Sequence, residues 1–462
     1  MSRHLQQTYI TYYLNISINS SKVKLIYIYN KYINVLYKGE NFKMAWSGSG
    51  TLSDPYLIST VDELIETTGS TQHYYYKLVN DLDLSAYNPW QTLVNDASNG
   101  LWIGSLDGNN KKISNLILNE NSAINVFIPP FIHYDYIGLF GYLVISSSEN
   151  AFIKNLIIDK CKLTLHNHDA SNNTFIGVLA ARNQDRLIEN VHITNFSASI
   201  LISPTDGFKY KIGGIVGVDE RFSKNVTSIT SCSVQYATAS ISASSDTYDN
   251  YHIFSFIANE IGSSCTHSFN YIKDCYGFSN FIDTSDVPIS DNIIAAYSNF
   301  ISINAKISNC YILNLFLTSS NRIVGFSAET FASAKISNIY SSIKVGNTDP
   351  DNVYPFCSDY YHLPTFSKCY YESGSYDFDG NDQSYFAGLT GSLSSSMKNQ
   401  SNYLDWDFNN IWTISPSVND GYPYFLKDII IATNPTFTIL TPNGGETYIY
   451  NQLIPISWSF SL

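Results

Sequence analysis

Residues 153–156 read Ile153-Lys154-Asn155-Leu156, and the return of this pattern along the chain decides the fold. The pattern is an aliphatic residue, any residue, a turn-tolerant polar residue, and then a small or aliphatic residue. Successive copies are separated by 40, 35, 41, 43, 35, 29 and 30 residues, a spacing typical of stacked repeats. The copies begin at Ile113, Ile153, Ile188, Ile229, Ile272, Ile307, Ile336 and, in a degenerate form, Phe366.

The residues of each copy favour a parallel β-solenoid. Asparagine tolerates the left-handed backbone that a coil needs at a corner, and amides stacked one coil apart can bond to one another. The flanking aliphatic residues then point inward and form a continuous core. Between the corners, segments 137–141 (IGLFG) and 212–217 (IGGIVG) supply residues without bulk, which allow neighbouring coils to approach closely.

Composition narrows the possible partners. The 462 residues carry a net charge of −13, and only 14% of them are charged, against about 25% in an average globular domain. The 26 lysines and arginines form no run interleaved with aromatic residues, which argues against nucleic acid as a partner. No uninterrupted apolar stretch is long enough to span a bilayer, so we expect no membrane insertion in this chain.

The sequence divides into five parts. Residues 1–43 are expected to be a non-native or disordered extension, because the composition changes abruptly at Met44. Residues 44–120 are expected to form the N-terminal part and cap of the solenoid. Its one short helix is predicted at residues 61–67, where Thr60 and Glu63 form a capping box and Gly69 is a stop signal. Repeats over residues 121–375 and a closing segment over residues 376–431 follow, and residues 435–462 form the last part.

Most of the chain resembles the GLUG-motif family, named for a Gly-Leu-any-Gly segment that reads GLFG at residues 138–141. The resemblance covers about residues 46–425. Its N-terminal signature reads GSGTLSDPYLIST and then IGSLDGNNKKISNLIL, and its closing signature runs from Gly388 to Phe425. The resemblance implies a right-handed parallel β-helix in large secreted, surface-anchored or virion-associated proteins, usually without a known activity. Segments 251–263 and 292–302 depart from the pattern.

Residues 435–462 resemble the opening of an Ig-like surface module, on the segments FTILTPNGGE at 437–446 and ISW at 456–458. This part has 28 residues, whereas a complete sandwich needs about 100. We therefore expect an incomplete Ig-like module, the truncated start of a β-sandwich. The full expected fold is all-β: a right-handed parallel β-helix with one short N-terminal capping helix and this β-sandwich start.

Cysteine and histidine offer little chemistry. Cys232, Cys275, Cys310 and Cys369 occupy one repeat position that holds Leu156, Val191 or Ile339 in other copies, which predicts buried core thiols. The sequence His166-Asn167-His168-Asp169 lacks a third ligand and is interpreted as an exposed loop. Residues Asp377 to Asp382 contain three carboxylates, but their spacing departs from a calcium loop, so a solvated turn is favoured.

Solenoids also host polysaccharide lyases and glycosidases, whose catalysis needs two or three carboxylates that converge on one face. The candidates are Asp81, Asp83 and Asp107. The first two follow the period of an ordinary half-exposed strand, and the third lies in an Asp-Gly turn. We therefore expect no catalytic, cofactor-binding or metal-binding residue and no cofactor. The many tyrosines are expected to be exposed and offer a second possibility, which is non-catalytic stacking on sugars.

These observations predict a non-enzymatic, extracellular repeat protein that acts as an adhesive module or structural spacer on a cell surface or a virion. The candidate partners are surface glycans or another cell-surface or virion protein. The alternative is a carbohydrate-active enzyme, either a polysaccharide lyase or a glycoside hydrolase, on the same β-helix. A groove with paired carboxylates would favour the enzyme, and a flat face of serine, asparagine and tyrosine would favour the adhesin.

Overall fold

The computed structural model describes residues 46–427, 436–441 and 457–461. Within these ranges it leaves out residues 97, 129–131, 145–150, 167–172, 203–209, 221–228, 244–253, 256, 262–270, 279, 285–292, 296–297, 302–304, 320–321, 331–333, 347–352, 360–363 and 374–385. The expectations for residues 1–43, for His168 and Asp169, and for Asp377 to Asp382 therefore lie outside the described residues. Gly48–Leu462 form one compact unit.

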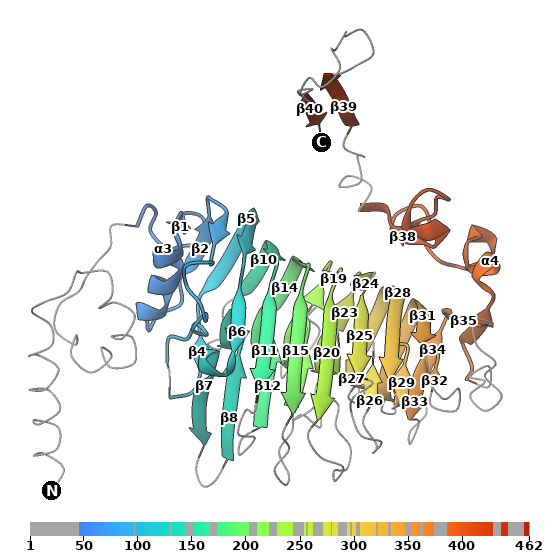
Figure 1. The fold of residues 1–462 in the computed structure, drawn as a ribbon, viewed down its shortest axis with the longest axis horizontal. Helices are drawn as coiled ribbons and strands as arrows, with labels where there is room; N and C mark the ends of the chain where they lie inside the picture. Colours follow the sequence, from blue (N-terminus) through green and yellow to red (C-terminus); the bar gives the residue numbers. More distant parts are fainter. Residues whose placement is uncertain are drawn as a thin grey trace, which may run out of the picture. The chain divides into compact units, whose positions relative to one another are not determined.

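The described chain is all-β with parallel sheets, and it visits three sheets in a repeating order (Figure 1). Strands β10 (Phe152–Asp159) and β11 (Lys162–His166) belong to a 20-stranded main sheet. The chain continues through β12 (Asn173–Gly177) of a five-stranded sheet and β13 (Ala180–Gln184) of an eight-stranded sheet. It then returns to the main sheet, where the next strands pair in parallel with β10 and β11. From Ile153 to Phe366, each passage is one coil of 29 to 43 residues.

The other strands follow the same scheme. In the main sheet they are β1 (Tyr56–Ile58), β2 (Tyr75–Leu78), β3 (Leu82–Asp83), β5 (Ser105–Ser114), β6 (Ile117–Asn119), β14 (Leu187–Thr194), β15 (Ser197–Ile202), β18 (Ile229–Thr230), β19 (Ser233–Gln235), β20 (Thr238–Ala243), β23 (Tyr271–Lys273), β24 (Tyr276–Phe278), β25 (Phe281–Thr284), β28 (Lys306–Ser319), β31 (Lys335–Gly346), β34 (Thr365–Ser367), β35 (Cys369–Glu372) and β36 (Leu389–Ser392).

The five-stranded sheet also contains β7 (Ile124–Ile128), β8 (Ile132–Ile137), β16 (Tyr210–Gly213) and β21 (Phe254–Ser255). The eight-stranded sheet also contains β4 (Leu101–Trp102), β9 (Phe140–Leu143), β17 (Val216–Glu220), β22 (Ala258–Ile261), β27 (Ser298–Ile301), β30 (Ser327–Thr330) and β33 (Cys357–Asp359). A three-stranded sheet joins β26 (Ile293–Ala295), β29 (Arg322–Val324) and β32 (Val353–Tyr354). Two antiparallel pairs complete the fold: β37 (Trp412–Thr413) with β38 (Tyr424–Phe425), and β39 (Thr436–Thr441) with β40 (Ser457–Ser461).

The predicted N-terminal helix is present as α3 (Val61–Glu66), followed by one 3-10 turn at Thr67–Gly69. Its capping box is confirmed, because the backbone N–H of Glu63 donates to Thr60 Oγ1 at 3.3 Å and the Glu63 carboxylate accepts from the Thr60 backbone N–H at 3.0 Å. A further one-turn helix, α4 (Ser394–Met397), lies in the closing segment.

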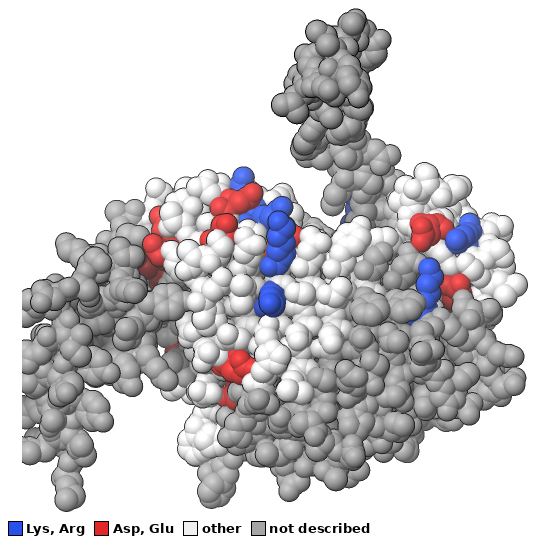
Figure 2. Space-filling view, viewed as in Figure 1, with Lys and Arg blue, Asp and Glu red and all other residues white. Residues whose placement is uncertain are grey.

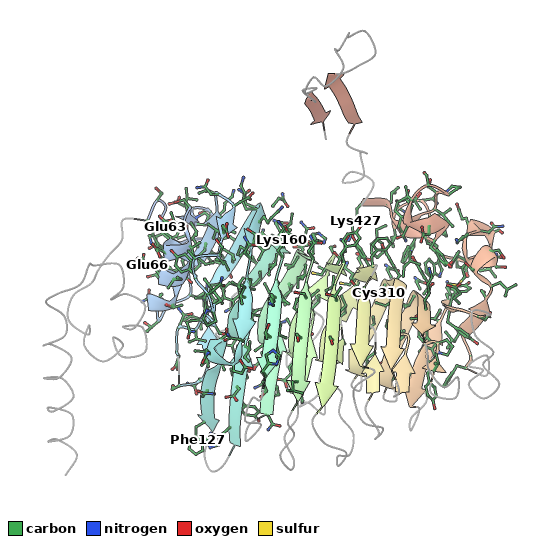
Figure 3. The ribbon with its side chains drawn as sticks, in the orientation of Figure 1. Glu63, Glu66, Phe127, Lys160, Cys310 and Lys427 are labelled. Atoms are coloured by element: carbon green, nitrogen blue, oxygen red, sulfur yellow. The ribbon has the colours of Figure 1, made fainter. Side chains whose placement is uncertain are left out.

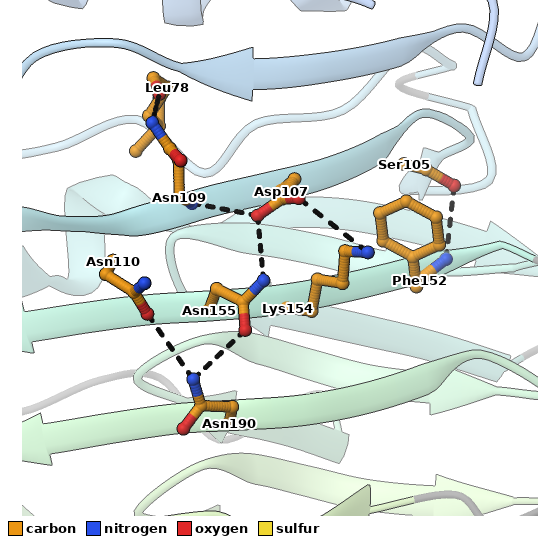
Figure 4. Close-up of polar contacts among 9 residues, drawn as sticks. All are labelled: Leu78, Ser105, Asp107, Asn109, Asn110, Phe152, Lys154, Asn155 and Asn190. Carbon is orange, nitrogen blue, oxygen red and sulfur yellow. Dashed lines mark hydrogen bonds and ion pairs between the residues drawn. The ribbon is translucent and has the colours of Figure 1, made fainter. Parts of the chain in front are cut away.

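The repeat pattern has the predicted corner conformation. The third residue of the seven copies from Ile153 onward has a left-handed backbone: Asn155, Asn190, Ser231, Asp274, Asn309, Asn338 and Lys368 have φ between 52° and 57°. The copy predicted at Ile113 is out of this register, because Ile113 pairs with Ile158, and its Asn115 with φ of 59° lies at the following corner beside Lys160. The amides of successive corners bond as expected. Asn190 Nδ2 donates to Asn155 Oδ1 at 3.0 Å (Figure 4). Asn338 Nδ2 donates to Asn309 Oδ1 at 3.2 Å.

The core follows the predicted inward columns. The fourth residue of the seven copies from Ile153 onward is fully buried in register with its neighbours: Leu156, Val191, Cys232, Cys275, Cys310, Ile339 and Cys369. The six described cysteines are all buried, so the prediction of core thiols is confirmed. Burial, with its thiol neighbours, raises the pKa of Cys275 well above its ordinary value. Glycine allows the close approach between coils, because a Cβ on Gly177 would lie 2.7 Å from the Cα of Val216 in the next coil.

The described part of the closing segment, residues 386–427, packs on the main sheet. Two residues after each corner, the outward side chains of four successive coils are Tyr276, Tyr311, Tyr340 and Tyr370. The rings of Tyr311 and Tyr340 are stacked at 5.1 Å with an interplanar angle of 3°. Trp406, Trp412, Tyr422 and Phe425 of the closing segment join these rings in one buried cluster.

Candidate functional site

The catalytic candidates Asp81 and Asp83 are exposed, and both bond to the chain itself. Asp81 Oδ1 accepts from the backbone N–H of Lys112 at 2.9 Å. Asp83 Oδ1 accepts from Asn115 Nδ2 at 2.8 Å and from the backbone N–H of Ser85 at 2.9 Å. These hydrogen bonds, that of Asn115 first, lower the pKa of Asp83 below its ordinary value, which suits a permanently ionised structural acceptor rather than a proton donor.

Asp107 belongs to the corner ladder of the first coils. Its Oδ1 accepts from Asn155 Nδ2 at 3.0 Å and from the backbone N–H of Asn109 at 2.8 Å. Lys154 Nζ lies 3.7 Å from its Oδ2 (Figure 4). Asp107 lies in β5 and pairs in register with Lys154, so the predicted Asp-Gly turn is part of a strand here. The left-handed residues beside it are Asn109 and Asn110, and the Asp107 oxygens hold two neighbouring coils together.

The metal candidates gain no support among the described residues. The backbone N–H of His166 bonds to the Glu120 carboxylate, and the rest of its motif is outside the described residues. Across the described ranges, no group of three or more His, Cys, Asp or Glu side chains is arranged to hold a metal ion.

An outward polar surface lies beyond the second corner of each coil. The left-handed residues of this corner are Lys160, Asn195 and Tyr236, with φ of 56°, 53° and 54°. Strands β11, β15 and β20 begin two residues later and pair in parallel register. We call the outward positions of these three coils the outer grid: Lys160, Lys162, Thr164, Asn195, Ser197, Ser199, Tyr236, Thr238 and Ser240.

The outer grid is flat and regular because it is built on one parallel sheet. Its rows are about 4.8 Å apart, and alternate residues along a strand repeat at about 6.6 Å. Seven of its nine residues are exposed, and Thr164 and Ser197 are half-buried. The alternate side chains Leu163, Ala198 and Ala239 point inward and are buried. The surface therefore offers hydroxyl and amide groups at fixed intervals on a rigid support.

Charges beside the outer grid are nearly balanced. Lys160 lies close enough to Asp83 and Asp159 to favour the ionised form of both carboxylates. Burial raises the pKa of Asp159, but hydrogen bonds from Asn195 and Thr194 and the nearby lysines outweigh it, so the pKa is lowered overall. Figure 2 shows lysine and arginine atoms in a short stripe on this face, with aspartate and glutamate atoms beside its upper end, and Figure 3 labels Lys160 there.

The expectation that many tyrosines are exposed is wrong for the described residues. Tyr311, Tyr340 and Tyr370 are only 2%, 0% and 8% exposed, because the aromatic residues of the closing segment cover them. Among the described tyrosines, only Tyr236 is exposed, at 52%. Its ring stands edge-to-face against Phe278 at 5.8 Å. The sugar-stacking hypothesis therefore rests on one described ring rather than on many.

Sequence reasoning missed a charged pair on the eight-stranded sheet. Arg182 of β13 donates from Nε to Glu220 of β17 at 2.9 Å, and both side chains are largely buried. The guanidinium also lies 4.5 Å over the ring of Tyr142. Burial opposes the charged form, but Glu220 raises the pKa of Arg182 above its ordinary value. In the sequence, this pair is visible only as two opposite charges at nearby positions of successive coils.

Comparisons with known proteins give limited likenesses. No family model matches the chain. It is 33% identical over 132 residues to halomucin of Haloquadratum walsbyi, and 28% identical over 152 residues to a protein of Evansella cellulosilytica provisionally named a Gly-rich membrane protein. These matches cover 27% and 32% of this chain but only 1% and 15% of those proteins.

One solved structure, from Bacteroides ovatus and provisionally named an immunoglobulin A1 protease, aligns over 82% of this chain and 94% of its own. The aligned pair has 18% identity and a TM-score of 0.42.

Proposed function

We propose that the chain is a non-enzymatic, surface-exposed repeat protein of the GLUG-motif type, acting as an adhesive module or structural spacer on a cell surface or a virion. The observation that carries this proposal is the outer grid, a flat polar face on a stack of parallel coils. The described carboxylate candidates bond to the chain's own amides and backbone, which fits structural roles. Surface display is supported by the names of the two relatives, one a halomucin and one a membrane protein.

The proposed fold in full is a right-handed parallel β-helix over residues 44–431, divided at residues 120 and 375 as expected from the sequence. Its handedness rests on a general rule, because connections between parallel strands of one sheet are right-handed in about 98% of cases. The antiparallel pair of β39 and β40 supports the proposed start of an Ig-like module at residues 435–462. Among the described residues, no helix is both long and apolar enough to cross a membrane.

The test combines binding and release on the same polysaccharides. The full chain is applied to a glycan array, and reducing ends are measured after incubation with each soluble polymer. We expect binding without release. Release that disappears in Asp81→Asn, Asp83→Asn or Asp107→Asn would instead establish the alternative, a carbohydrate-active enzyme. If neither binding nor release is detected, the adhesive role is refuted and the spacer role remains.

A further inference from the structure

We infer that the outer grid binds a linear, uncharged polysaccharide whose chain lies across successive coils, with Tyr236 as its stacking platform. This inference rests on the proposed function, because it names the ligand class of that same face. Its starting point is the position of Tyr236, the one exposed tyrosine that the structure describes. An aromatic ring that is half-exposed and held edge-to-face by Phe278 can receive the apolar face of a sugar.

The left-handed backbone at Tyr236 indicates that folding alone does not explain a tyrosine at this position. Bulky residues are genuine outliers at positive φ, whereas asparagine adopts this conformation readily. Asn195 occupies the equivalent corner one coil earlier. Folding alone would therefore favour asparagine at residue 236, so the ring needs a reason other than the corner geometry.

The neighbours of Tyr236 supply hydrogen bonds of both kinds. Thr238 and Ser240 continue its row, and Ser197 and Ser199 stand beside them in register. Each hydroxyl donates one hydrogen bond and accepts others, which matches the hydroxyl groups of a sugar. Because the rows repeat at about 4.8 Å, the grid suits a ligand that also repeats, and a polymer meets this condition better than a compact molecule.

Charge decides between neutral and acidic polymers. None of the nine grid positions carries a carboxylate, and the charge of Lys160 is shared with Asp83 and Asp159. Lys162 is the second cation of the grid, while the whole chain carries a net charge of −13. A polyanion would be repelled at long range and would find little compensation at the grid, so an uncharged chain is favoured.

The experiment is affinity electrophoresis of the full chain in gels containing dextran, laminarin or hydroxyethylcellulose, with heparin and polygalacturonate as charged arms. We expect retardation by at least one uncharged polymer that persists when salt is added, because screening weakens only charge pairs. Retardation by the charged polymers alone, or loss of binding in salt, would overturn the inference in favour of an acidic ligand. No retardation by any polymer would also overturn it.

Three variants locate the site. Tyr236→Asn should weaken binding roughly tenfold, about 1.4 kcal/mol, while leaving thermal stability equal or higher, because asparagine suits the corner. Thr238→Val should weaken it several-fold by removing one hydroxyl without changing shape. Phe127→Ala is the matched control, since Phe127 is 50% exposed on β7 and outside the grid. Unchanged binding in both grid variants would refute the site, whereas release of reducing ends would refute the proposed non-enzymatic function alone.

Discussion

Replacing Asn309 tests the physical reason for the repeated corner asparagine. Asn309 lies in β28 with φ of 52°. Its Nδ2 donates to Asp274 Oδ1 at 3.1 Å, and its Oδ1 accepts from Asn338 Nδ2 at 3.2 Å. One side chain therefore serves both the local backbone and the contacts to the coils on either side.

The two contributions can be separated by comparing alanine with glycine. Both variants lose the two side-chain hydrogen bonds, which together contribute roughly 1–3 kcal/mol. Alanine must also adopt the left-handed backbone, at a cost of about 1–2 kcal/mol. Glycine avoids this cost but loses about 0.5–1 kcal/mol through its freer unfolded chain. We therefore expect Asn309→Gly to be the more stable of the two, by about 0.5–1 kcal/mol.

The assay is urea unfolding followed by tryptophan fluorescence. Trp412 is a suitable reporter because its ring lies 6.1 Å from Tyr311, two residues after the corner. Midpoints are compared at equal slopes, since unfolding of a repeat array is not guaranteed to be two-state. At the control position Ser337, an ordinary strand residue of β31, the order should reverse and Ala should exceed Gly. Equal stability of the two Asn309 variants, or a more stable alanine, would refute the corner argument.

Three further predictions concern packing and charge. Gly177→Ala should destabilise the fold by about 3 kcal/mol or more, because the added Cβ would meet the backbone at Ala180 and Val216. Gly69→Ala is the control and should be nearly neutral, because nothing lies within 4 Å of a Cβ there. Thermal unfolding measures both variants, and similar losses of stability would contradict the close-approach explanation. Burial, followed by the charge of Lys427, lowers the pKa of His192 to about 4. Between about pH 6.5 and 4 the unfolded chain therefore binds more protons than the folded chain, and the free energy of unfolding should decrease by up to about 3 kcal/mol as the pH is lowered. Urea midpoints at pH 7 and 4.5 should show a smaller fall in His192→Gln, and an equal fall would exclude His192 as the cause. Arg182→Ala should lower the free energy of unfolding by about 3–5 kcal/mol, because it leaves Glu220 buried without its counter-charge. Adding Glu220→Ala should restore part of this stability. A double-mutant cycle without a coupling energy would show that the two residues do not stabilise the fold as a pair.

The corners and the core columns could be predicted from the sequence because their causes are local. A left-handed residue restricts which amino acid can stand there, so Asn155, Asn190 and Asn309 recur in the same pattern. Inward positions likewise exchange Leu, Val, Ile and Cys, which differ little as core residues. Both requirements repeat with every coil, so even one sequence contains several independent copies of the signal.

The covered tyrosines and the charged pair depend on contacts that no local pattern records. Tyr340 is buried under the closing segment, where its hydroxyl donates to the carbonyl of Pro423, 83 residues away, at 2.6 Å. Arg182 and Glu220 come together only when the register of β13 against β17 is known. Because the segments between corners vary in length, that register could not be counted from the sequence. The outer grid was missed for the same reason.

The two ends of the main sheet's outward face differ in a way that bears on binding. Toward the C-terminal coils, the outward column is aromatic and the closing segment covers it. An exposed column of this kind would invite self-association, so the covering segment removes one class of partner. The outer grid of β11, β15 and β20 is polar apart from one ring. A ligand recognised there gains little from each row, because hydroxyl groups exchange one hydrogen-bond partner for another. Useful affinity then requires several rows to engage one repeating chain together, which gives a stacked fold a physical reason to serve as an adhesive.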